Sequence, residues 1–167
     1  METKQLYSLF GLPLIAFNVS VMAVEIDGKT YPGALCQSET NTQSIVRNRQ
    51  GVMLNTGTGP QTWICPIVRN HVSLEGAIIV VRDRNAVEGD PNADVSCTLF
   101  SRTPTGRLVA SETQGSTSTG VVALEYGAGE PGINSQLNGY YYFRCTIPGT
   151  FEGLRSGVVE YVVVENF

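Results

Sequence analysis

The spacing of apolar residues restricts the fold of this chain more than any other feature of the sequence. Apolar side chains alternate with polar ones or come in short β-branched runs, and clusters of Gly, Pro, Asn, Ser and Thr interrupt them about every dozen residues. After the first stretch of the chain, no segment shows the spacing of an amphipathic helix. The pattern therefore predicts an all-β domain.

We expect nine short strands, at residues 44–49, 52–55, 62–68, 76–84, 94–102, 107–113, 118–126, 139–147 and 157–165. Strands of this number and length favour an antiparallel β-sandwich, either jelly-roll-like or immunoglobulin-like. The last of them is apolar on both faces except at Glu160, which predicts a central place in its sheet.

The first stretch of the chain has the composition of a secretory signal. Residues 5–24 contain no charged side chain, and Lys4 precedes their apolar run. Val21 and Ala23 supply the small residues found three and one positions before a cleavage site. We therefore predict that residues 1–23 are a signal peptide.

An uncleaved membrane anchor is the alternative interpretation, because about 20 apolar residues can cross a bilayer. Gly11 and Pro13 argue against it, since both interrupt the apolar run. Cleavage leaves residues 24–167 as a single domain. We expect that domain to be secreted or periplasmic, with no stable membrane insertion.

The chain has four cysteines, an even number, and export to an oxidising compartment predicts two disulfides. Three pairings can be drawn. Pairing Cys36 with Cys65 and Cys97 with Cys145 is the one that we favour, because it keeps both loops local and non-crossing. A zinc site would need close cysteine pairs, and these cysteines are tens of residues apart.

The cysteines also indicate which side chains face the core, because residues two apart share one face of a strand. Trp63 should then be buried near Cys65, and Tyr141 should face inward with Cys145. Tyr140 and Tyr142 should face outward, where two rings would form a platform on which sugars stack. The alternative is that these tyrosines only pack between strands.

Oxygen-bearing side chains are concentrated in residues 83–94, between two expected strands. The candidate calcium ligands are Asp83, Asp90, Asn92 and Asp94. The last three have the every-second-residue spacing of an EF-hand loop, but Val95 stands where its glycine is expected and Ser101 where its bidentate acid is expected. A calcium site of another kind or a polar hairpin loop remain as interpretations.

Charge and motif content argue against several functions. The net charge is −4 and no basic stripe is present, which disfavours nucleic-acid binding. His71 is the single histidine and no Gly-x-Ser-x-Gly elbow occurs, which disfavours a catalytic triad. A pair of carboxylates can catalyse glycoside hydrolysis, and the candidates on or near expected strands are Glu75, Asp83, Glu125 and Glu160.

Several short motifs follow one another in a distinctive order. They are Tyr31-Pro32-Gly33-Ala34-Leu35-Cys36, Cys65-Pro66-Ile67-Val68-Arg69, Val95-Ser96-Cys97, the Tyr-rich segment 140–148 and Ser156-Gly157-Val158. With these motifs the chain resembles a family of uncharacterised secreted bacterial proteins. The resemblance implies export, two disulfides and a β-sandwich, and it implies no activity, ligand or catalytic residue.

Taken together, these features predict an exported, non-enzymatic binding or surface-associated protein. Its ligand would be a glycan or a protein. A structural or adhesive protein that self-associates through strand edges is the alternative from a different class, and a hydrolase is the third.

Overall fold

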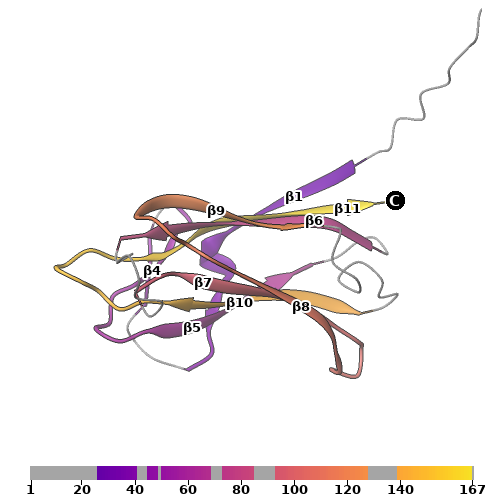
Figure 1. The fold of residues 1–167 in the computed structure, drawn as a ribbon, viewed down its shortest axis with the longest axis horizontal. Helices are drawn as coiled ribbons and strands as arrows, with labels where there is room; N and C mark the ends of the chain where they lie inside the picture. The colour runs from indigo at the N-terminus through magenta and orange to yellow at the C-terminus, as the bar shows by residue number, and fades with distance from the viewer. Residues whose placement is uncertain are drawn as a thin grey trace, which may run out of the picture.

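The computed structural model describes residues 26–40, 45–48, 50–68, 73–84, 93–127 and 139–166. Two antiparallel sheets pack face to face (Figure 1). Their elements are β1 (Ile26–Pro32), the 3-10 helix η1 (Gly33–Leu35), β2 (Gln37–Ser38), β3 (Ile45–Arg47), β4 (Met53–Asn55), β5 (Gln61–Ile67), β6 (Ser73–Asp83), β7 (Ser96–Arg102), β8 (Leu108–Gly115), β9 (Gly120–Gly127), β10 (Tyr140–Ile147) and β11 (Gly157–Asn166).

The sandwich predicted from the alternation is thereby confirmed. Sheet A has the order β3-β4-β11-β6-β9, with β1 also paired to β11, and sheet B has the order β2-β5-β10-β7-β8. The apolar strand β11 lies centrally, as expected, between β6 on one side and β1 and β4 on the other. In the described part of the chain, no helix has the length and hydropathy needed to cross a bilayer.

The strands β1 and β2 were not among those expected from the sequence. The segment of β1 contains Gly28, Lys29 and Pro32, and it shows no apolar alternation. Its strand conformation comes from antiparallel pairing with β11 along its whole length. A partly buried ion pair between Lys29 and Glu165 joins the same two strands. Tertiary pairing therefore outweighs local preference here.

Both disulfides have the favoured pairing, Cys36–Cys65 and Cys97–Cys145. Cys97 and Cys145 stand directly opposite each other on β7 and β10. Trp63, on β5, stands opposite Cys145 and is fully buried, as the phase of the cysteines predicted. Both disulfides thus lie in the core: Cys97–Cys145 cross-links β7 and β10, and Cys36–Cys65 joins the residue before β2 to β5.

Tyrosines of sheet A connect the two sheets by donating hydroxyl hydrogen bonds to backbone carbonyls at or beside sheet B. Tyr126 donates to the Cys97 carbonyl over 2.7 Å, Tyr161 donates to the Pro66 carbonyl over 2.6 Å, and Tyr31 donates to the Val68 carbonyl over 2.6 Å. Burial raises the pKa of Tyr126 and of Tyr161 well above the ordinary tyrosine value, with smaller contributions from Glu112 and Tyr31 respectively. Both hydroxyls therefore stay protonated as donors.

Candidate functional site

Three aromatic side chains form a row on the outer face of sheet B, which we call the aromatic row: Phe100, Tyr142 and Tyr140. Alternation along β10 places Tyr141, which is 2% exposed, in the core and Tyr140, which is 43% exposed, at the surface. Tyr142 is half-buried on the same outer face. The predicted phase of all three tyrosines is therefore confirmed.

The rings of the aromatic row are nearly parallel. Those of Phe100 and Tyr142 have centroids 5.1 Å apart and an interplanar angle of 17°. Those of Tyr142 and Tyr140 are 6.1 Å apart at 22°. The spacing follows from the sheet, because Tyr142 stands opposite Phe100 on the neighbouring strand and Tyr140 is two residues away on the same strand. The three rings are therefore stacked along the row, and Phe100 and Tyr142 partly cover each other's faces.

Arg102 holds the centre of this surface in place. Its Nε donates a 2.8 Å hydrogen bond to the Tyr142 hydroxyl, and its Nη1 donates one of 2.7 Å to the Gly106 carbonyl. The guanidinium carbon lies 5.5 Å from the Phe100 ring centroid and 5.8 Å from that of Tyr142. Guanidinium has five N–H donors, so these two bonds leave donors for a ligand. The Tyr142 hydroxyl accepts from Arg102, which leaves its own proton to be donated.

The β7–β8 hairpin supports the outer end of the row. Its turn is closed by backbone hydrogen bonds from Thr103 N to Arg107 O and from Gly106 N to Thr103 O, both of 2.9 Å. Gly106 has φ of +86°, and a Cβ built there would lie 3.7 Å from the Tyr140 hydroxyl oxygen. Tyr140 thus rests beside the hairpin that also supplies the Gly106 carbonyl to Arg102.

No protein-family model matches this chain, and no curated protein matches it in sequence. The resemblance noted above therefore rests on the motifs alone.

Among solved structures, distant likenesses include three carbohydrate-binding modules. The CBM36-1 domain of a multidomain xylanase from the hindgut metagenome of Trinervitermes trinervoides has a TM-score of 0.47 and 7% identity over 84% of this chain and 98% of that one. TmCBM61 in complex with β-1,4-galactotriose has a TM-score of 0.44 and 6% identity over 78% and 84%. The xylan-binding module CBM15 has a TM-score of 0.43 and 10% identity over 85% and 97%.

Phe100 and Arg102 were missed by the sequence reasoning. Both carry the signal of an outward position, since each lies an odd number of residues from the inward-facing Cys97. What the sequence lacks is the information that β7 is the neighbour of β10, because alternation determines faces and not neighbours.

The calcium candidates are only partly described. Asp83 is fully buried and accepts hydrogen bonds from the Val95 amide (2.9 Å), the Ser116 hydroxyl and the Ser156 hydroxyl (3.2 Å). Asp94 lies in the turn before β7, whereas Asp90 and Asn92 lie outside the described residues. Across the described residues no group of three or more His, Cys, Asp or Glu side chains could hold a metal. A calcium site that uses Asp90 and Asn92 stays a prediction.

The other catalytic candidates are not brought together in the described part of the chain. Asp83 faces the interior, while Glu125 and Glu160 face outward on β9 and β11, with β6 between those strands. Glu75 is half-buried on β6, and His71 lies outside the described residues. The aromatic row with Arg102 is therefore the candidate site that the structure builds most fully.

Proposed function

We propose that this chain is an exported, non-enzymatic binding protein that holds a glycan on the outer face of sheet B. The observation that carries the proposal is the aromatic row, with Arg102 hydrogen-bonded beside it. The C–H faces of sugar rings are apolar and pack on aromatic rings. Sugar hydroxyls need donors and acceptors, which Arg102 and the tyrosine hydroxyls supply at the edge of the rings.

The rigidity of the surface also supports glycan binding. The row lies on β7 and β10, the two strands cross-linked by Cys97–Cys145, and Arg102 is held by two hydrogen bonds. Little side-chain entropy would then be lost when a ligand binds, so a greater share of the contact energy appears as affinity.

Export is supported by the disulfides, since such bonds persist in oxidising compartments. Residues 1–23 have the composition of a signal peptide. We therefore place the protein in the periplasm or outside the cell.

A glycan array probed with the purified, exported chain tests the proposal. We expect binding to a limited set of glycans, and we expect Tyr142→Ala to weaken it about tenfold or more because the central ring contacts both neighbours. Tyr140→Ala and Phe100→Ala should weaken it by smaller factors. Circular dichroism of each variant checks that the sandwich is intact.

Phe151→Ala is the matched control. Phe151 is also an exposed aromatic, 51% accessible, but it lies in the loop after β10 and outside the aromatic row. Its removal should leave glycan binding unchanged. Failure of the native chain to bind any glycan, or equal losses in Phe151→Ala and Tyr142→Ala, would show that the row is not a glycan site.

A further inference from the structure

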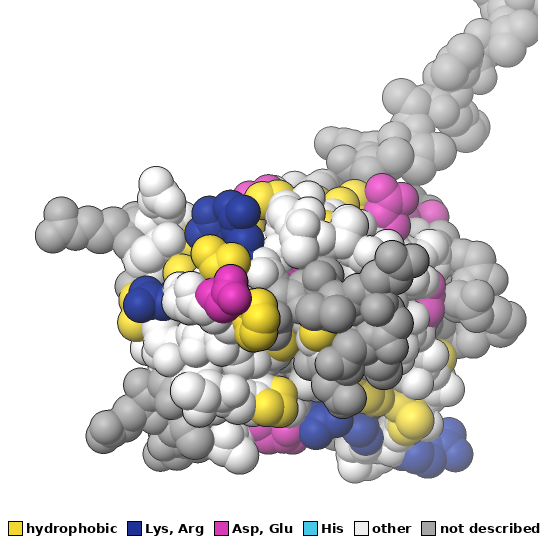
Figure 2. All heavy atoms as spheres, turned by 60° about the vertical axis from the view of Figure 1, so that its left-hand side comes forward, with side chains coloured by type: hydrophobic (Ala, Val, Ile, Leu, Met, Phe, Trp, Pro, Cys, Tyr) yellow, Lys and Arg dark blue, Asp and Glu magenta, His cyan; other side chains and the backbone are white. Residues whose placement is uncertain are grey.

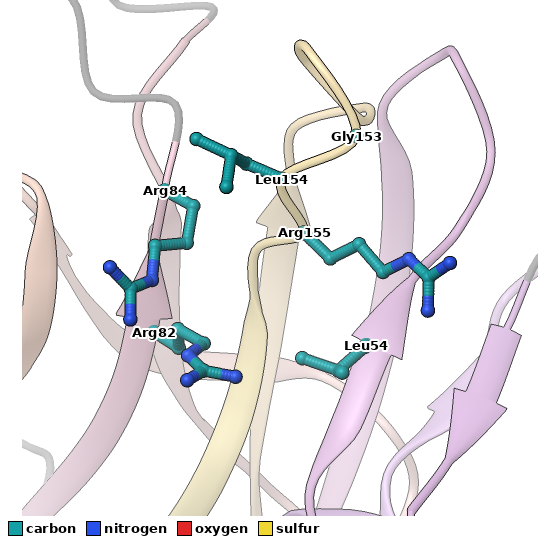
Figure 3. Close-up of a pocket in the computed structure, with 6 residues that line it drawn as sticks. All are labelled: Leu54, Arg82, Arg84, Gly153, Leu154 and Arg155. Atoms are coloured by element: carbon teal, nitrogen blue, oxygen red, sulfur yellow. The ribbon is translucent and has the colours of Figure 1, made fainter.

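A second surface feature lies at the other end of the sandwich from the aromatic row. Strand β10 begins at the row with Tyr140 and ends at Ile147, and the loop that follows borders a depression of about 410 Å³. We call it the arginine depression. Its lining residues are Leu54, Arg82, Arg84, Gly153, Leu154 and Arg155 (Figure 3).

Two of the arginines project from one strand because of its alternation. Asp83, between them, faces the core and accepts hydrogen bonds from Val95, Ser116 and Ser156. Arg82 and Arg84 consequently face outward. In Figure 3 they lie together on one side of the depression, while the Arg155 side chain extends away from them on the other side.

A glycine lies between two of the residues that line the depression. Gly157 stands opposite Leu54 on β4 and opposite Arg82 on β6, and it contributes no side chain between them. A Cβ at this position would lie 2.0 Å from the Met53 carbonyl oxygen, so only glycine fits the backbone here.

The loop between β10 and β11 closes the upper side of the hollow. Phe151 and Leu154 form an isolated β-bridge around Glu152 and Gly153, whose φ angles are 50° and 78°. This tight turn places Leu154 towards Arg84 in the view of Figure 3.

The depression is positively charged in an acidic protein. Among the described residues its lining includes three arginines and no acidic residue, although the chain carries a net charge of −4. The ion pairs within the described residues, Lys29–Glu165 and Arg144–Glu39, use none of these arginines. Figure 2, which brings this end of Figure 1 forward, shows cationic side chains in separate groups and hydrophobic ones in small patches among polar atoms.

We propose that the arginine depression binds an oxyanion, namely a carboxylate, sulfate or phosphate group carried by an acidic ligand. The guanidinium fork matches the two-oxygen edge of such groups and binds it through paired, charge-assisted hydrogen bonds. Leu54 and Leu154 bring apolar surface to the site, which lowers the local dielectric and strengthens those bonds. Arg82 and Arg84 are the principal ligands and Arg155 is a rim residue. This site is independent of the glycan surface.

Nuclear magnetic resonance of the isotopically labelled chain tests the proposal. Sodium sulfate, sodium phosphate and sodium glucuronate are titrated separately at constant ionic strength, which is maintained with sodium chloride. We expect saturable shifts at the amides of Arg84, Leu154 and Gly157, and the anion with the highest affinity identifies the group. Arg82→Gln and Arg84→Gln should each weaken binding about tenfold, and Arg155→Gln less.

Arg107→Gln is the charge-matched control, because it removes one exposed arginine from the β7–β8 hairpin. It should leave the anion affinity unchanged, as should Tyr142→Ala. Shifts that follow ionic strength alone, or that persist in the Arg82→Gln/Arg84→Gln double variant, would overturn the proposal.

Discussion

The two sheets of this sandwich differ in what stabilises them and in which side chains cover their outer faces. Both disulfides attach to sheet B: one joins Cys36, the residue before β2, to β5, and the other joins β7 to β10. The outer face of this sheet carries aromatic rings and Arg102. In its described residues sheet A has no disulfide, and half-buried aliphatic side chains cover its outer face, among them Ile78, Val80 and Val162. Buried polar contacts at Asp83 and Glu165 join its strands to their surroundings.

The difference suggests why exposed rings are tolerated on one sheet. An aromatic row on a solvated face contributes less to folding than the same rings would in the core. The Cys97–Cys145 disulfide lies on the inner face of the same two strands, so it adds to the stability of sheet B without occupying the outer face. Sheet A, which has no such links, depends on apolar strands and buried hydrogen bonds.

The largest effect is expected from removing a disulfide. Cys97→Ala/Cys145→Ala should lower the free energy of unfolding by about 4 kcal/mol, because it frees a loop with a sequence separation of 48 residues. Urea denaturation measures this loss, and hydrogen exchange should show faster opening of β7 and β10 than of β6 and β11. Cys36→Ala/Cys65→Ala, with a separation of 29, should cost slightly less. Equal opening of both sheets would contradict the comparison.

The next largest effect concerns the buried carboxylate near the end of β6. Asp83→Ala should cost about 3 kcal/mol, because the Val95 amide and two serine hydroxyls lose a buried acceptor. Thermal unfolding compares it with Glu160→Ala, which removes an exposed carboxylate from the same sheet. Similar losses in both variants would show that the Asp83 contacts contribute little.

Removing a single bridge between the sheets should have a moderate effect. Tyr161→Phe and Tyr126→Phe should each cost about 1 kcal/mol, since each leaves a backbone carbonyl of sheet B without this donor. Denaturant titration of the two variants and the double variant measures these costs. An unchanged midpoint in both would mean that packing alone sets the distance between the sheets.

The same hydroxyls predict alkaline sensitivity. Their pKa values are raised in the folded state, so the protonated form is favoured by folding. Their contribution is complete below the unfolded tyrosine pKa of about 10 and declines as the pH rises above it. Tyrosinate absorbance followed alongside circular dichroism should show these two groups ionising only as the protein unfolds. Ionisation of all tyrosines before any loss of structure would contradict this prediction.

The smallest effect is expected at the surface ion pair of sheet B. Arg144 and Glu39 lie 2.9 Å apart with side chains 47% and 45% exposed. Glu39→Gln should change the free energy of unfolding by less than about 1 kcal/mol, because exposed pairs are screened by water and salt. A larger loss, seen in urea denaturation at low and high salt, would mean that the pair anchors β2 to sheet B.

Alternation in the sequence predicted which face of a strand each side chain occupies, but it did not predict which strands lie next to each other. Cys145 indicated the phase of β10, and the inward Tyr141 and outward Tyr142 followed from it. The register that places Phe100 beside Tyr142 is a long-range property that no local pattern contains. The same holds for the arginine depression, where Arg82, Leu154 and Leu54 meet only after three strands have paired.

The register of β7 with β10 separates the residues of the aromatic row from those of the core. On both strands the even-numbered residues face solvent and the odd-numbered residues face the core. Residues 98, 100, 102, 140, 142 and 144 can therefore vary together while the disulfide and the interior stay as they are. Such a scaffold could acquire new ligands by substitution at these positions alone, which makes it a suitable starting point for selecting binders from a library.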